Sequence, residues 1–136
     1  MLTAHIVVDD IIALLKGSTL CANLSGEVYR EGERPRNSSA EDVVVTFING
    51  MSSQIENGAV TLNIYIADIT PYANGQYVEN GARTKAVEIL ASQWVKSLSA
   101  ALTNYRFKLL RTISTYAEPE IHQHRVAVQL EYYYKF

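Results

Sequence analysis

The sequence has very little cysteine: Cys21 is the single one among 136 residues. One cysteine excludes a disulfide within the chain and a metal site built from several thiolates. A catalytic thiol needs a base and a group that orients this base, and nothing near Cys21 in the sequence supplies them. We therefore interpret Cys21 as a small buried apolar residue.

Long apolar runs are also missing. No stretch approaches the roughly 18 consecutive apolar residues that a membrane span needs. The first five residues, 1–5, lack the basic region and the apolar run of a secretory signal peptide. We expect a protein that is cytosolic when it is made, with no membrane partner.

Charge of one sign is not in excess. Twelve Lys and Arg residues stand against 14 Asp and Glu residues, which gives a net charge of −2. Proteins that bind nucleic acid through its phosphates usually carry a clear basic excess. The balance therefore predicts no nucleic-acid partner.

Recognisable catalytic patterns are absent from the sequence. There is no glycine-rich phosphate loop and no nucleophile elbow. Sequence-adjacent carboxylates such as Asp9 and Asp10 diverge on a helix, so they do not flank one bond as an acid and base pair. We predict a protein that is not an enzyme and that needs no cofactor.

Two histidines, His122 and His124, are the best candidate metal ligands. Residues two apart on a strand point to the same face, so both could bind one ion, with Glu118 and Glu120 nearby. The segment also contains Pro119, which favours a turn. We interpret it as a surface turn and predict no metal, with a metal-binding domain as the alternative.

The composition predicts a folded domain. Apolar residues make up 48% and charged residues 19% of the chain, which is typical of globular proteins. A chain of this length fits one domain, residues 1–136, and buries a core without covalent staples.

Apolar periodicity predicts two helices. The first covers residues 3–16, with Thr3 as N-cap and Gly17 as stop. The second is long, residues 79–102. Its apolar side chains recur every fourth residue on one stripe: Ala82, Ala86, Leu90, Trp94, Leu98 and Leu102, widened by Val87, Ile89 and Ala101. We assign Trp94 to the core and expect an exposed pair between Glu79 and Arg83.

Alternation and β-branched runs predict about five strands, at residues 27–30, 43–48, 60–66, 105–113 and 126–136. We expect Asn57-Gly58 to form a type I′ hairpin turn, because both residues tolerate positive φ. Residues 68–78 are predicted to be a loop. The order of elements disfavours a doubly wound parallel sheet. The predicted fold is α+β: a mostly antiparallel twisted sheet carrying the long helix, with a short N-terminal helix.

Two segments are candidate contact surfaces for subunits or partners. Residues 30–42 form a polar loop in which the charges alternate in sign: Arg30, Glu31, Glu33, Arg34, Arg36, Glu41 and Asp42. The last strand carries three consecutive tyrosines, which must point to both faces of a sheet: Tyr132, Tyr133 and Tyr134. A solvated loop and a mixture of core and surface tyrosines are the simpler alternatives.

The order of elements and a few short strings resemble a known family. Gly-Glu-Val-Tyr at 26–29, Asp-Val-Val-Val at 42–45 and Thr-Leu-Asn-Ile-Tyr-Ile at 61–66 occur in the order seen in tail-completion, or tail-terminator, proteins of long-tailed bacteriophages, which are often encoded in prophages. The resemblance covers nearly the whole chain.

The resemblance implies a function in assembly. Such proteins form a ring, typically hexameric, that caps the tail tube and offers a surface to the head–neck connector. It therefore implies a virion tail protein whose partners are copies of itself, the tail tube and head–neck proteins. A head–tail connector or neck component, a small ligand-binding α+β domain and a general interaction module are the alternatives.

Overall fold

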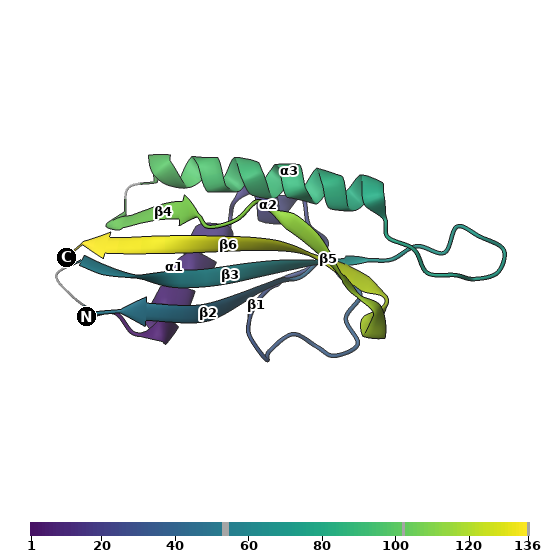
Figure 1. The fold of residues 1–136 in the computed structure, drawn as a ribbon, viewed down its shortest axis with the longest axis horizontal. Helices are drawn as coiled ribbons and strands as arrows, with labels where there is room; N and C mark the ends of the chain where they lie inside the picture. Colours follow the sequence, from purple (N-terminus) through teal and green to yellow (C-terminus); the bar gives the residue numbers. More distant parts are fainter. Residues whose placement is uncertain (53–54, 102, 136) are drawn as a thin grey trace.

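In the part of the chain that the structure describes, a six-stranded sheet and three helices make up two layers (Figure 1). The computed structural model describes residues 1–52, 55–101 and 103–135. The helices are α1 (Ala4–Leu15), α2 (Thr19–Ala22) and α3 (Gly81–Ser97), and two 3₁₀ turns follow at Leu98–Ala100 and Pro119–Ile121. The strands are β1 (Val28–Arg30), β2 (Val43–Met51), β3 (Ile55–Ala67), β4 (Tyr105–Leu109), β5 (Ser114–Glu118) and β6 (Gln123–Lys135).

The strand order is β1-β2-β3-β6-β4, and β5 pairs with the first half of β6 while β4 pairs with its second half. β1 runs parallel to β2, and every other pairing is antiparallel. This confirms the predicted α+β fold with a mostly antiparallel sheet. The prediction missed β5, because its sequence, Ser-Thr-Tyr-Ala-Glu, has no apolar alternation.

One face of the sheet carries the core. Val60, Leu62 and Ile64 of β3 are fully buried there, as their alternation predicted, beside Val126 and Val128 of β6. α1 and α3 both pack on this face, and the indole of Trp94 donates to the carbonyl oxygen of Leu14 at 3.4 Å. In Figure 1, α1 and α2 lie behind the sheet, so the view looks onto its uncovered face.

Helix α1 is as predicted. The side chain of Thr3 accepts a hydrogen bond from the amide of Ile6 and caps the helix. Gly17 ends it with φ of 79°, which glycine adopts without strain. Cys21 is half-buried against the core, and burial raises the pKa of its thiol.

The predicted turn at Asn57-Gly58 is wrong. Both residues lie inside β3, where Gly58 pairs with Gly50 of β2 and with Tyr132 of β6. A Cβ at Gly58 would lie 2.1 Å from the carbonyl oxygen of Asn49 and 2.7 Å from the Tyr132 ring. Gly58 therefore serves close packing rather than positive φ.

The buried stripe of α3 differs from the predicted one. Thr84, Val87, Ala91 and Trp94 are buried, whereas Ala82 is exposed and Ile89 is 50% exposed. Trp94 belongs to the core, as predicted. Leu102 lies outside the described residues. Because a helix has 3.6 residues per turn, side chains spaced by four move gradually around it. Side chains spaced alternately by three and four stay on one face, which is the spacing of the buried residues.

The expected pair between Glu79 and Arg83 is also wrong. Arg83 binds Glu41 instead, with its Nε 2.6 Å from Oε2. The contact between α3 and Glu41, which is distant in sequence, thus replaces the local pair that a spacing of four residues predicted. Among the described residues, no helix is long and apolar enough to cross a membrane.

Candidate interaction surfaces

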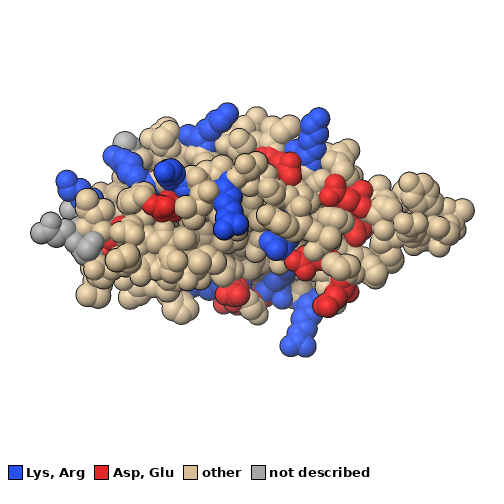
Figure 2. Space-filling view, in the orientation of Figure 1, with Lys and Arg blue, Asp and Glu red and all other residues tan. Residues whose placement is uncertain are grey.

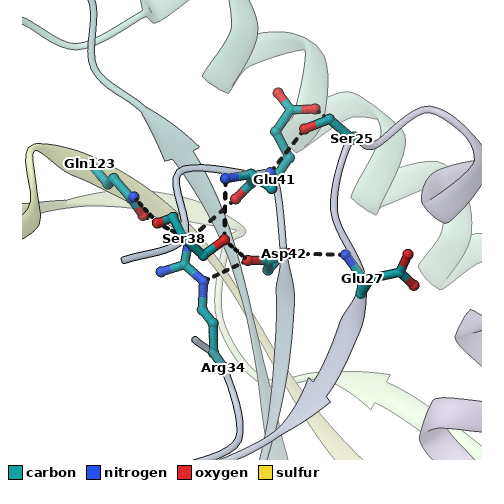
Figure 3. Close-up of polar contacts among 8 residues, drawn as sticks. Ser25, Glu27, Arg34, Ser38, Glu41, Asp42 and Gln123 are labelled. Atoms are coloured by element: carbon teal, nitrogen blue, oxygen red, sulfur yellow. Dashed lines mark hydrogen bonds and ion pairs between the residues drawn. The ribbon is translucent and has the colours of Figure 1, made fainter. Parts of the chain in front are cut away.

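The charged loop between β1 and β2 is fastened to the sheet at Asp42 (Figure 3). One carboxylate oxygen accepts from the Glu27 amide at 2.9 Å, and the other accepts from Arg34 Nε at 2.9 Å and from the Ser38 hydroxyl at 2.5 Å. Gly26 leaves room for this carboxylate, because a Cβ there would lie 2.2 Å from Asp42 Oδ1. We call this set of contacts the Asp42 latch.

Arg34 extends the latch to β6. Its Nη2 donates to the carbonyl oxygens of Ser38 and Ala40, each at 3.2 Å, and to Oε1 of Gln123 at 3.0 Å. The Nε2 of Gln123 donates to the carbonyl oxygen of Ser38 at 2.7 Å. The guanidinium also stacks on the Tyr65 ring, 4.1 Å from the centroid.

The contacts of the latch favour the ionised form of Asp42. Burial by itself raises the pKa of this carboxyl, but the hydrogen bonds from Ser38, the Glu27 amide and Arg34 outweigh it and hold the pKa below its ordinary value. The bond to Arg83 likewise lowers the pKa of the neighbouring Glu41. Both carboxylates therefore act as structural anchors of the loop.

The predicted contact residues of this loop divide into two groups. The side chains of Arg34, Glu41 and Asp42 bond within the chain, and Arg30 does so as well, because it contacts Asp9 and His5 of α1. A second group is exposed and stays a candidate contact surface: Glu31, Glu33 and Arg36. The loop is thus held to the rest of the chain by four charged side chains and exposes three others to solvent.

The three C-terminal tyrosines have different positions. Tyr132 is 3% exposed and packs beside Phe47 and Tyr105 in the core. Tyr134 is half-buried and meets the Tyr105 ring edge-on at 4.8 Å. Tyr133 is 37% exposed on the uncovered face of the sheet. Only Tyr133 is therefore open to a partner.

Tyr105 anchors this aromatic cluster to α1. Its hydroxyl donates to Asp10 Oδ2 at 2.6 Å. Burial, together with this bond, raises the pKa of Tyr105 well above its usual range. The hydroxyl therefore stays protonated and keeps β4 tied to α1.

A loop between β3 and α3 projects from the body and is its most prominent surface feature (Figure 1). We call residues 69–78 the knob. Every residue from 69 to 77 is exposed, and none of the ten carries a charge. Ile69, Tyr72 and Tyr77 are 40%, 59% and 52% exposed. Exposed tyrosine rings of this kind are enriched in protein interfaces.

The knob is held in shape by its own bonds. Ile69 and Val78 exchange two backbone hydrogen bonds of 2.9 Å at its base. At its tip the Gly75 amide donates to the Tyr72 carbonyl at 3.1 Å, and Gly75 has φ of 75°. A loop with such internal bonds loses little conformational entropy when it binds.

The two histidines support the base of the knob. His122, in the left-handed region with φ of 54°, stacks on Tyr77 with 3.8 Å between ring centroids. His124 Nδ1 lies 2.6 Å from Asp68 Oδ1, and its Nε2 lies 3.6 Å from Glu79. Within the described ranges, no three His, Cys, Asp or Glu side chains are grouped to hold a metal ion.

Charge is unevenly distributed along the long axis. Figure 2 shows the knob at the right without blue or red, with acidic side chains around its base. In sequence, Asp68 and Glu79 stand on either side of the knob, and Glu118 and Glu120 lie at the end of β5 and in the turn that precedes His122. Arg106 and Lys135 stand at the other end, and both are exposed.

Sequence reasoning pointed to the charged loop and missed the knob. The available signal was ten consecutive uncharged residues, Ile-Thr-Pro-Tyr-Ala-Asn-Gly-Gln-Tyr-Val, in a loop between two well-patterned elements. Comparison of the chain with protein-family models and with curated proteins gave no match. The likeness to phage tail terminators therefore stays a prediction.

Proposed function

We propose that this chain is a non-catalytic structural protein that assembles with copies of itself. Following the family resemblance, we further propose that the assembly is a ring that caps a phage tail tube and joins it to the head–neck connector. The observation that carries the proposal is the knob: a shaped, uncharged, aromatic protrusion in which every residue from 69 to 77 is exposed.

The chemistry of the knob suits a protein partner. Tyrosine is enriched in protein interfaces because its ring is apolar while its hydroxyl stays hydrated. Tyr72 presents such a ring at 59% exposure, and Ile69 adds apolar surface at 40%. A protein partner can cover both, whereas a phosphate-rich partner would find no cation on the knob.

The ionisable side chains support a structural role. Asp42 and Glu41 bind Arg34 and Arg83, Glu118 binds Arg125 with 2.6 Å between Oε1 and Nε, and Asp68 contacts His124. The pairs Glu41–Arg83, Glu118–Arg125 and Asp68–His124 join different parts of the fold, and the pair Asp42–Arg34 lies within the loop between β1 and β2. The charges therefore hold the scaffold that presents the knob.

The test is the association of wild type and two tyrosine variants in sedimentation velocity. We expect wild type to form a species of several subunits. Tyr72→Ala is expected to weaken association at least about tenfold, as for a residue central to an interface, with stability within about 0.5 kcal/mol of wild type.

Tyr116→Ala is the matched control, because Tyr116 is 45% exposed and lies on β5, outside the knob. It is expected to associate as wild type does. A wild-type chain that stays monomeric at every concentration, or equal weakening by both substitutions, would contradict the proposal.

A further inference from the structure

The knob and a groove lie at opposite ends of the molecule. β3 and β6 have 13 residues each and run the length of the sheet. At about 3.3 Å per residue, this places the two ends roughly 40 Å apart. The knob follows Ala67, the last residue of β3, whereas Ile55, the first, pairs with Lys135 at the far end.

We call the far-end depression the end groove. It has a volume of about 580 Å³ and is lined by Ile55, Thr103, Asn104, Arg106, Tyr133 and Lys135. Ile55 is 48% exposed and Tyr133 37% exposed, so part of the lining is apolar. This volume is in the range of ordinary ligand pockets and exceeds that of one aromatic side chain.

The knob and the end groove are complementary in charge. Glu79, which follows the knob in sequence, and Glu120, in the turn after β5, are exposed, and the side chain of Glu79 is 41% exposed. Arg106 and Lys135, which border the end groove, are exposed as well. An uncharged tip that carries Tyr72 and has acidic residues near its base thus matches a partly apolar groove bordered by basic residues.

We propose that the tip of the knob, led by Tyr72, occupies the end groove of a second copy of this chain. The knob cannot reach the end groove of its own chain, since about 40 Å of sheet separates them. Every copy carries both a knob and an end groove, so the contact is head-to-tail and repeats from copy to copy. This rests on the proposed self-assembly and adds which surfaces meet.

The test uses the full chain and two variants, each defective in one half of the contact. Tyr72→Asp places a charge on the knob, and Arg106→Glu/Lys135→Glu reverses the charge at the end groove. Each variant alone is expected to sediment as a monomer where wild type assembles. Lys16→Glu/Lys85→Glu has the same charge change on two exposed residues, the C-cap of α1 and a position in α3, and is expected to assemble as wild type does.

Mixing the two defective variants gives the decisive result. In a head-to-tail contact, the intact knob of one variant fits the intact groove of the other, and the mixture forms a dimer that cannot grow. Native mass spectrometry should show this dimer, with one chain of each variant. Equal urea midpoints for the variants and wild type verify that all are folded.

The outcomes separate the two proposals. If wild type assembles but the mixture stays monomeric, or if either variant assembles alone as wild type does, the head-to-tail contact is wrong and self-assembly still stands. If wild type is a monomer at every concentration, both proposals fail.

Discussion

Gly50 and Gly58 face each other across β2 and β3 beneath the Tyr132 ring. A Cβ on Gly50 would lie 2.7 Å from the Tyr132 hydroxyl, and one on Gly58 would lie 2.7 Å from Gly50 Cα. Two glycines in paired strands weaken a sheet. Here they make room for a buried tyrosine, which ties three strands into one core.

We predict that Gly58→Ala lowers the free energy of unfolding by about 2–3 kcal/mol, since backbone atoms cannot move aside as a side chain can. Urea denaturation measures this loss. Gly81→Ala is the control, because its Cβ would meet only the Glu79 side chain, at 3.5 Å, at the start of α3. Gly81→Ala should be neutral or stabilising. Equal effects of the two substitutions would contradict the close packing at Gly58.

The Asp42 latch predicts acid sensitivity. Asp42 and Glu41 have lowered pKa values in the folded chain, so the unfolded chain binds more protons as the pH falls. Their contribution to stability is complete above the unfolded values near pH 4 and is lost as the pH falls through the folded values. The urea concentration at the unfolding midpoint is therefore expected to decrease once the pH is lowered below about 4.

Asp42→Asn tests the origin of this loss. At pH 7 it should cost about 2–3 kcal/mol, because the buried carboxylate accepts bonds from a cation and a hydroxyl. It should also flatten the decline of stability at low pH. A variant as acid-sensitive as wild type would show that other carboxylates cause the decline.

At the scale of elements, the apolar pattern of α3 determines that a helix forms but leaves open which face of it packs on the sheet. The apolar side chains predicted the helix and the burial of Trp94, because both depend on local spacing. They did not fix which side faces the sheet, because Ala82, Ala86 and Ile89 are apolar and yet none of them is fully buried. The contact with β6 and α1 decides the rotation of the helix.

We predict that Val87→Ala costs about 2 kcal/mol, because Val87 is fully buried. Ile89→Ala, a larger truncation two residues away, should change stability by no more than about 0.5 kcal/mol, since the side chain is 50% exposed. Thermal or urea unfolding compares them directly. A loss at Ile89 equal to that at Val87 would mean that Ile89 also faces the core, as the sequence pattern predicted.

The candidate contact surfaces were harder to predict from sequence than the fold. Charge alternation marked Arg34 and Asp42 as surface residues, but their opposite charges make a buried pair possible. The three tyrosines did divide between the core and the surface, as strand alternation requires. Projection of the knob depends on how β3 and α3 leave the body, and no local pattern encodes that.

At the scale of the whole molecule, the chain is a two-layer plate with different ends. One end presents the uncharged knob with its acidic flank, and the other presents the end groove with its basic border. A molecule with two different complementary ends forms closed rings or open filaments, depending on the rotation between neighbours. Capping a tube requires the closed form.

The most direct measurement of the central claim is electron microscopy of the purified wild-type chain, at a concentration where sedimentation detects assembly. The account predicts closed rings of one size, and Tyr72→Ala should remove them while Tyr116→Ala preserves them. Single particles of monomer size, or filaments and irregular aggregates without rings, would contradict it.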